Sequence, residues 1–393
     1  MRQERLQHNG YIVINGLHNA ALFAARPYLS LIAADFGASV MVVGFITSLY
    51  SVSQVLWAMP LGRLLDRRGT QPVVRCGAAA FLLAVLGLAF ARHLAVITLC
   101  AMLLGLSHVT ILLSVQNMLT AVRDQTRRDH YIGMISFSAS AGAFAGPLLG
   151  GYLRDTWGSS RGFLGAAGLG LLCLLLTLVI PVREQTAGSA RKASLGGLLR
   201  NSQIMRPVLV SGAVLFATEV TMSYLPLYCA QIGISALTIG SIMSVKGIAQ
   251  MIIRPFLKTL VQLFRRERLL TLCLLLGGLC LAAYGLVHAS WLFFVVAGLA
   301  GLSIGLALPL TLLAVSLVAP PDQRSQVLAL RIMGNYLGQS MSPLIFGLIG
   351  QLAGLAPVFW LSGLVMAIST TILRPQGSKR KGGRTPPEST SDT

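Results

Sequence analysis

Long apolar segments alternate with short polar ones along almost the whole chain. A helix needs roughly 20 mostly apolar residues to cross a bilayer. By that measure the sequence predicts spans at 11–33, 41–61, 74–91, 94–122, 131–153, 162–181, 207–230, 236–257, 269–288, 291–318, 327–350 and 357–373. We therefore expect an all-α membrane protein with twelve transmembrane helices.

One sizeable polar connection separates these spans into two groups of six. It covers residues 182–206 and contains glycine, serine and basic residues in close succession. The sequence thus predicts an N-terminal six-helix half at 1–181, a cytoplasmic linker at 182–206 and a C-terminal six-helix half at 207–375. Residues 376–393 are rich in Lys, Gly, Pro and Ser, a composition that predicts a disordered cytoplasmic tail.

Composition agrees with a membrane protein, because 54% of the residues are hydrophobic and only 11% are charged. A soluble core of this length could not bury so much apolar surface. With the N-terminus inside, twenty-four basic residues fall on the cytoplasmic side, and only Arg92, Arg154 and Arg161 fall on the other. This positive-inside bias predicts a multi-pass protein of the bacterial inner membrane with both termini cytoplasmic. It also accounts for the net charge of +19 without a nucleic-acid partner.

Several kinds of chemistry have no motif in this sequence. The six cysteines stand alone in apolar stretches, with no CxxC pair, so we expect neither disulfides nor a metal site. No GxxxxGK[ST], HExxH or GxSxG sequence occurs, which argues against ATP as the energy source and against a hydrolase. We expect no enzyme activity and no cofactor.

The first of two glycine-rich motifs lies after the second span, where residues 62–69 read G-R-L-L-D-R-R-G. Gly62 and Gly69 permit a tight turn, while Asp66 can cap the next helix or pair with a cation such as Arg67. The alternative interpretation is an ordinary charged loop between two helices.

The second motif lies in the fifth span, where residues 142–151 contain Gly142, Gly146, Pro147, Gly150 and Gly151. Glycines four residues apart form a flat face on which another helix can approach closely, and the proline bends the helix. A packing role without any part in transport is the alternative.

Together these motifs resemble the major facilitator superfamily, and within it the twelve-helix drug–proton antiporter branch. Residues 62–69 match its loop between helices 2 and 3, and residues 142–151 match the antiporter motif of helix 5. Residues 33–39 and 342–347 are also similar to this branch. The resemblance covers about residues 11–373. It implies alternating access around a central cavity, with export more usual than import.

The chain departs from that family pattern in two places. Helix 4 of the antiporters usually carries a buried arginine, whereas 94–122 contains no Arg or Lys and has His108 near that place. The connection from Arg254 to Arg268 lacks the glycines of the repeated loop motif. The resemblance therefore leaves the route of the coupling ion open.

Ionisable side chains inside a span are costly and usually face a cavity or a partner. Glu219 is the acidic residue deep in a span, while Asp35 lies at the outer end of the first. We predict Glu219, with Asp35 as a second candidate, to gain and lose the coupling proton. A static ion pair of Glu219 with Lys246 or Arg26 is the alternative.

Polar residues recur at helical spacing on several spans, and in the facilitator fold helices 1, 7, 8 and 11 contribute to the cavity wall. The predicted cavity residues are Asn15, His18, Asn19, Arg26, Tyr50, Gln54, Gln116, Asn117, Lys246, Gln250, Asn335 and Gln339. Arg26 and Lys246 could hold an anionic substrate, and the amides could bond substrate or each other. His18 and His108 are either hydrogen-bond partners or proton relays. Arg254 and Arg331 are predicted to form gate pairs, or else to extend to the interface.

These observations predict a monomeric, proton-coupled secondary transporter that exports a small organic solute. The solute would be a drug-like amphiphile, or a metal chelator of the siderophore type. An importer of a small solute such as a siderophore is the main alternative. A non-transporting receptor or scaffold is another, but polar stripes on several helices argue against it, because a scaffold needs no wet interior.

Overall fold

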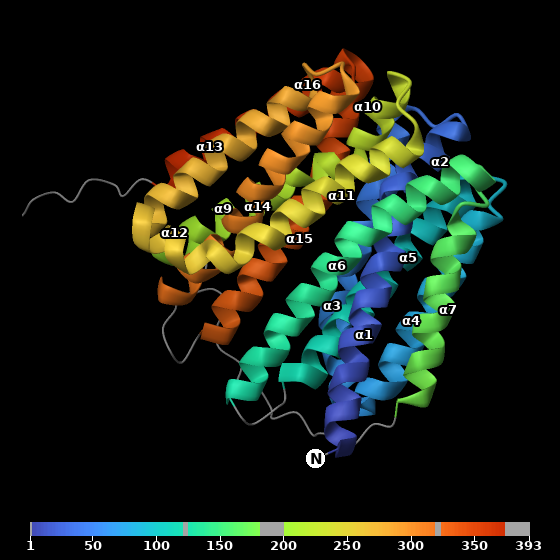
Figure 1. The fold of residues 1–393 in the computed structure, drawn as a ribbon, viewed down its shortest axis with the longest axis vertical. Helices are drawn as coiled ribbons and strands as arrows, with labels where there is room; N and C mark the ends of the chain where they lie inside the picture. The colour runs from blue at the N-terminus through green and yellow to red at the C-terminus, as the bar shows by residue number, and fades with distance from the viewer. Residues whose placement is uncertain (1, 121–124, 181–199, 319–323, 374–393) are drawn as a thin grey trace, which may run out of the picture.

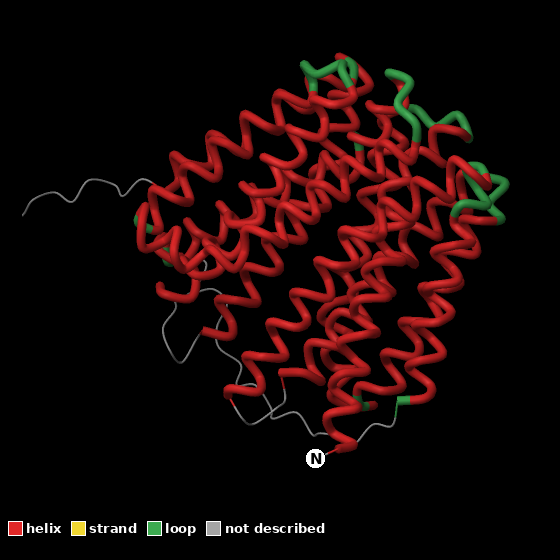
Figure 2. The backbone as a smooth tube through the Cα atoms, in the orientation of Figure 1, coloured by secondary structure: helices red, strands yellow, loops and turns green. Residues whose placement is uncertain are grey.

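The computed structural model describes residues 2–120, 125–180, 200–318 and 324–373. Regular structure within these ranges is helical throughout (Figure 2). Much of the predicted linker and all of the predicted tail lie outside the described residues, so both stay predictions.

The helices form two successive groups. The first group consists of α1 (Arg2–Ala25), η1 (Arg26–Tyr28), α2 (Leu29–Asp35), α3 (Val40–Arg68), α4 (Thr70–Ala89), α5 (Leu94–Thr120), α6 (Gln125–Trp157) and α7 (Phe163–Val179). The second consists of α9 (Ser202–Ser223), α10 (Leu225–Gln231), α11 (Ala236–Ile253), η2 (Arg254–Phe256), α12 (Leu257–Phe264), α13 (Arg266–Tyr284), α14 (Ser290–Val318), α15 (Arg324–Ala353) and α16 (Leu355–Leu373). Because α1–η1–α2, α9–α10 and α11–η2–α12 each form one broken helix, the two groups contain six spans each.

Eight of these units are long and apolar enough to cross a membrane, within the part of the chain that the structure describes. Helix α7 is apolar but shorter. The remaining long helices, α1, α6 and α15, carry more polar residues. They are three of the helices on which the sequence places polar stripes or the glycine motif, which is why hydropathy alone underestimates the number of spans.

Prolines set the breaks in the first, seventh and eighth spans. Pro27, Pro226 and Pro255 each stand at the start of the segment that follows the break. A proline has no N–H to donate, so it removes one backbone hydrogen bond of a helix and fits best in the first turn. The first break leaves Arg26 directly after α1, as the first residue of η1, in the last third of the span that ends at Asp35.

The two halves are related by an internal repeat with a constant offset. Positive φ angles occur in three pairs of described residues: Gly37 and Gly233, Gly69 and Arg265, and Gly158 and Gly354. The two members of each pair lie 196 positions apart, and no other described residue has a positive φ. The serines that cap α3 and α11, Ser39 and Ser235, have the same spacing. Arg265, at φ 60°, is the one non-glycine among them. The connection from Arg254 to Arg268 therefore makes the same turn as the loop at 62–69, although it lacks the glycines of that motif.

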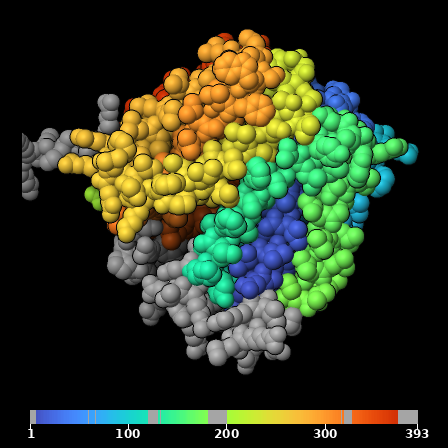
Figure 3. Space-filling model, viewed as in Figure 1, coloured from blue at the N-terminus to red at the C-terminus, as the bar shows by residue number. Residues whose placement is uncertain are grey.

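The halves contact each other mainly through α3 with α15 and α6 with α11. Figure 1 shows them close together at the end where α2 and α10 lie, and diverging toward the end that carries the N-terminus. In the space-filling view the surface is hollowed between the halves on that side, below the contact of α6 with α11 (Figure 3). The structure is thus closed at one end and open at the other.

Candidate functional site

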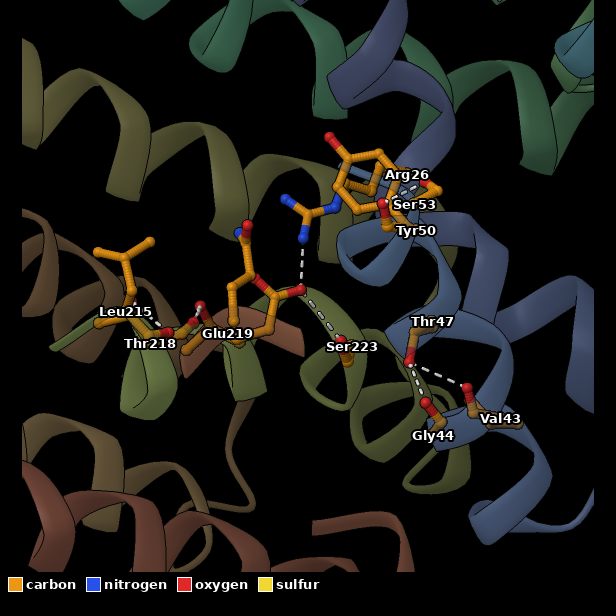
Figure 4. Close-up of polar contacts among 12 residues, drawn as sticks. Arg26, Val43, Gly44, Thr47, Tyr50, Ser53, Leu215, Thr218, Glu219 and Ser223 are labelled. Carbon is orange, nitrogen blue, oxygen red and sulfur yellow. Dashed lines mark hydrogen bonds and ion pairs between the residues drawn. The ribbon is translucent and has the colours of Figure 1, made fainter. Parts of the chain in front are cut away.

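An ion pair between Arg26 and Glu219 joins the two halves at the break of the first span. Both side chains are largely buried, with 11% and 3% of their surface exposed. Glu219 Oε2 also accepts a hydrogen bond from Gln339 Nε2 at 2.8 Å, and Oε1 accepts one from Ser223 Oγ at 3.4 Å. Figure 4 shows the guanidinium of Arg26 pointing at the carboxylate. The pair and its hydrogen bonds therefore bring η1, α9 and α15 together.

Within the N-terminal half, Arg26 contacts the first of a series of stacked rings. The Arg26 guanidinium lies over the ring of Tyr50, 4.1 Å from its centroid. Tyr50 in turn stacks on His108, whose Nδ1 lies 3.0 Å from His18 Nε2. His108 is thus bonded to the polar stripe of α1.

Lys246 is the second cation of this region. Its side chain is buried on α11 and its ammonium donates a hydrogen bond to the hydroxyl of Thr221. It lies within electrostatic range of both Glu219 and Arg26. The buried centre therefore contains two cations and one carboxylate. A cavity of about 10 Å³ adjoins the ion pair, lined by Arg26, Leu29, Thr47, Tyr50, Glu219, Met222 and Ser223.

Several predicted cavity residues instead bond neighbouring helices or each other. Asn15 donates to Ser138 Oγ at 2.8 Å and Asn19 donates to the carbonyl of Asn15 at 2.8 Å. Asn335 accepts from Ser211 at 2.8 Å. Asn117 donates to Thr70 at 3.2 Å. Gln54 is buried on α3, whereas Gln116 and Gln250 are half-buried on α5 and α11.

The predicted gate residues differ in their partners. Arg254 donates to Ser140 Oγ at 2.7 Å and so connects the two halves. Arg331 donates to the carbonyl of Leu308 and to Thr311 Oγ1, at 3.0 and 3.1 Å, and these contacts stay within its own half.

Asp35 lies away from the central ion pair, at the closed end. It pairs with Arg154 at 2.6 Å, and 43% of its side chain is exposed. Both residues belong to the N-terminal half and border a hollow of about 330 Å³ that also reaches Gln231 and Ile239 of the other half.

The glycines of α6 allow close contact with two partners. A Cβ at Gly142, Gly146 or Gly150 would lie 2.3–2.6 Å from backbone atoms of Ala20 or Ala24 in α1. A Cβ at Gly151 would lie 2.3 Å from the carbonyl of Ala236, in the other half. The motif therefore packs α6 on both α1 and α11.

The loop motif at 62–69 has a plainer local role. Gly69 ends α3 at φ 75° and α4 begins at the next residue. A Cβ at Gly62 would meet nothing within 4 Å, and Arg67 is exposed. The Asp66 side chain lies outside the described residues.

Sequence reasoning missed three residues that close the far end. Tyr28 and Tyr224, 196 positions apart, donate to the carbonyls of Pro147 and Pro343. Gly240 of the C-terminal half packs against the Tyr28–Pro147 bond, and Gly44 of the N-terminal half packs against the Tyr224–Pro343 bond. Asp155 accepts from the backbone N–H of Ala236 and Leu237 at 3.1 and 2.8 Å, so it caps α11 across the halves. Aligning the chain with itself at the 196-residue offset would have paired the tyrosines.

Comparison with known proteins agrees with this architecture. The family model of the Major Facilitator Superfamily matches residues 12–233 and 208–391. The chain belongs to this superfamily of membrane transporters. Two broken, pseudo-symmetric six-helix halves around a buried ion pair fit such a transporter, and the match supports no enzymatic role.

Curated relatives include the multidrug resistance protein MdtG of Dickeya zeae (strain Ech586). It is 26% identical over 373 residues, covering 89% of each chain. The protein of that name from Klebsiella pneumoniae (strain 342) is 27% identical over 379 residues, covering 91% of this chain and 90% of the relative.

Solved structures with the same fold include two transporters. One is a bacterial homologue of the human lysosomal transporter Spinster, in an inward-facing and occupied conformation, with a TM-score of 0.78 and 13% identity over 93% of this chain and 95% of that one. The other is a POT family transporter in complex with 5-aminolevulinic acid, with a TM-score of 0.77 and 14% identity over the same shares.

Proposed function

We propose that this protein is a proton-coupled exporter of small organic solutes that works by alternating access. The observation that carries the proposal is the buried carboxylate of Glu219, which bridges the two halves through Arg26. Among the described residues it is the one acidic side chain that is fully buried. A titratable group inside a membrane span is a functional candidate by default.

The proton would act on the contact between the halves. Ionised Glu219 holds Arg26 of the opposite half, whereas protonated Glu219 loses the charge that attracts it. Loading and releasing a proton would thus weaken and restore a link across the interface as the halves rock. Asp35, exposed at the closed end, is the candidate for proton exchange with that side.

The solute would bind between the halves, beside Arg26, Tyr50, Lys246 and Gln339. A drug-like amphiphile fits the name of the relatives, and a metal chelator fits the two cations. We place the protein in the bacterial inner membrane as a monomer, with both termini in the cytoplasm, because of the basic connections. The open end then faces inward, as in the Spinster homologue.

The test is gradient-driven flux in proteoliposomes, with ethidium and carboxyfluorescein as cationic and anionic probes. Glu219→Gln should abolish flux driven by a pH gradient while leaving exchange of probe at equal pH. Asp35→Asn should slow driven flux without abolishing it. Glu267→Gln is the matched control, because Glu267 is exposed in the first turn of α13. Wild-type driven flux in Glu219→Gln would remove this residue from the mechanism.

An importer is a second candidate, which the excess of buried cations favours. If a proton on Glu219 frees Arg26 for an anionic solute, the proton and the anion bind together and move in one direction. An inward proton gradient would then drive carboxyfluorescein inward. For an antiporter the same gradient drives the probe outward, so the sign of the flux separates the two.

A further inference from the structure

Four basic side chains surround the junction of α12 and α13. They are Lys258, Arg265, Arg266 and Arg268; all are exposed except Arg266, which is half-buried. We call them the α12–α13 basic surface. Within the described parts of the chain no ion pair or hydrogen bond is formed by these four side chains. The single acidic residue of the junction is Glu267, so the surface carries a clear excess of positive charge.

Arg265 is the whole connection between the two helices, and its backbone conformation is costly. Its φ of 60° and ψ of 141° lie where side chains with a Cβ are rarely found. The equivalent position of the N-terminal half is Gly69, at φ 75°. A glycine would make the same turn without strain. Backbone strain of this kind clusters at functional and ligand-binding sites, which makes the exposed Arg265 side chain a candidate for binding a ligand.

Large apolar side chains lie directly beside these cations. Leu263 and Phe264, which precede Arg265, are 71% and 42% exposed, and Phe256 at the start of the segment is 54% exposed. Apolar residues open to the outside next to exposed arginines mark the level where acyl chains give way to headgroups. The basic surface therefore lies at the phosphate level of one leaflet.

We propose that the α12–α13 basic surface binds the headgroup of an anionic phospholipid, with Arg265 as a principal ligand of the phosphate. A guanidinium can donate two parallel N–H bonds to a phosphate. Basic residues at the membrane surface attract anionic lipids. The acyl chains of the bound lipid lie against Leu263 and Phe264. Bound there, the lipid fixes the end of the eighth span, which packs on α6 across the halves.

The experiment measures thermal unfolding of the purified full-length protein in detergent, with phosphatidylglycerol or phosphatidylcholine added. Phosphatidylglycerol should raise the wild-type midpoint more than phosphatidylcholine does. Arg265→Gly should lose most of that difference. Since glycine suits the turn, this variant folds, and its lipid-free midpoint should be at least that of the wild type.

Two further variants and one soluble probe complete the test. Arg265→Lys keeps the cation and should keep most of the response. Arg161→Gln removes an exposed arginine from the opposite end and should respond like the wild type. An equal response of Arg265→Gly and wild type overturns the proposal. So does an equal rise with soluble glycerol phosphate, which would indicate a general effect of anions.

Discussion

Arg26 and Glu219 lie on different halves yet depend on each other for their charge balance. Arg26→Gln would leave a carboxylate buried without its cation, and removing one partner of a buried pair costs about 3–5 kcal/mol. The double variant Arg26→Gln/Glu219→Gln should recover most of this loss. Chemical unfolding of the three proteins in detergent measures the difference.

The same double variant separates structure from coupling. A purely static pair would give back stability and driven flux together in the double variant. We expect stability to return while flux driven by a pH gradient stays absent. A single Arg26→Gln variant as stable as the wild type would show that Glu219 is already uncharged or otherwise paired.

Arg265 and Gly69 offer a matched test of backbone strain. Arg265→Gly should stabilise the lipid-free protein by about 1 kcal/mol, because glycine adopts positive φ without the steric cost of a Cβ. Gly69→Ala should cost about 1–2 kcal/mol for the same reason. A Cβ at Gly69 would meet nothing within 4 Å, so the cost is that of the backbone alone. Unfolding midpoints measure both, and equal signs of the two changes would contradict the argument.

At the scale of elements, glycines decide how closely helices of the two halves can approach. A Cβ at Gly44 would lie 2.3 Å from the Pro343 carbonyl and the Tyr224 hydroxyl, and one at Gly240 would lie 2.1 Å from the Pro147 carbonyl. Backbone atoms cannot move aside as a flexible side chain can. Gly44→Ala and Gly240→Ala should therefore push α3 from α15 and α11 from α6 at the closed end.

Spin labels measure that separation directly. Labels at Trp157 and Leu352, exposed at the ends of α6 and α15, should move apart in both alanine variants. Gly168→Ala is the control, since a Cβ there meets nothing within 4 Å and the distance should stay the same. Cys76, the exposed one among the six free cysteines, is replaced by serine for the labelling. An unchanged distance in Gly44→Ala would mean that this contact does not hold the end closed.

At the scale of the whole molecule, Asp155 links the halves through the N-terminus of α11. A carboxylate at a helix N-terminus satisfies orphan N–H groups and interacts with the helix dipole, and its loss costs about 0.5–2 kcal/mol. Every 1.4 kcal/mol changes a two-state ratio about tenfold. Asp155→Ala should thus shift the population toward the state open at this end.

The same pair of spin labels reports this shift as a second, longer distance. Asp35→Asn is the comparison, because the Asp35–Arg154 pair lies within one half and its loss should leave the distances unchanged. A single short distance in Asp155→Ala would show that the cap contributes too little to bias the conformation.

Much of the architecture was predictable because it depends on local composition. Twenty apolar residues in a row can satisfy their backbone groups in a bilayer only as a helix, so the spans could be counted before any contact was known. The polar α1 and α15 were recognisable as spans for another reason, since their Asn, His, Arg and Gln residues recur at helical spacing. Most helices run several residues beyond the predicted spans, because hydropathy does not determine where a helix ends.

The sequence alone determined the helical class, the division into six and six, and the short set of ionisable residues that a bilayer makes costly. Tertiary structure decided which of these meet. That Glu219 pairs with Arg26 and that Asp155 caps α11 depend on the placement of one half against the other, while the bond from Lys246 to Thr221 depends on how α11 packs on α9. No local pattern encodes that placement, because each such contact joins residues from different helices, many of them far apart in the chain.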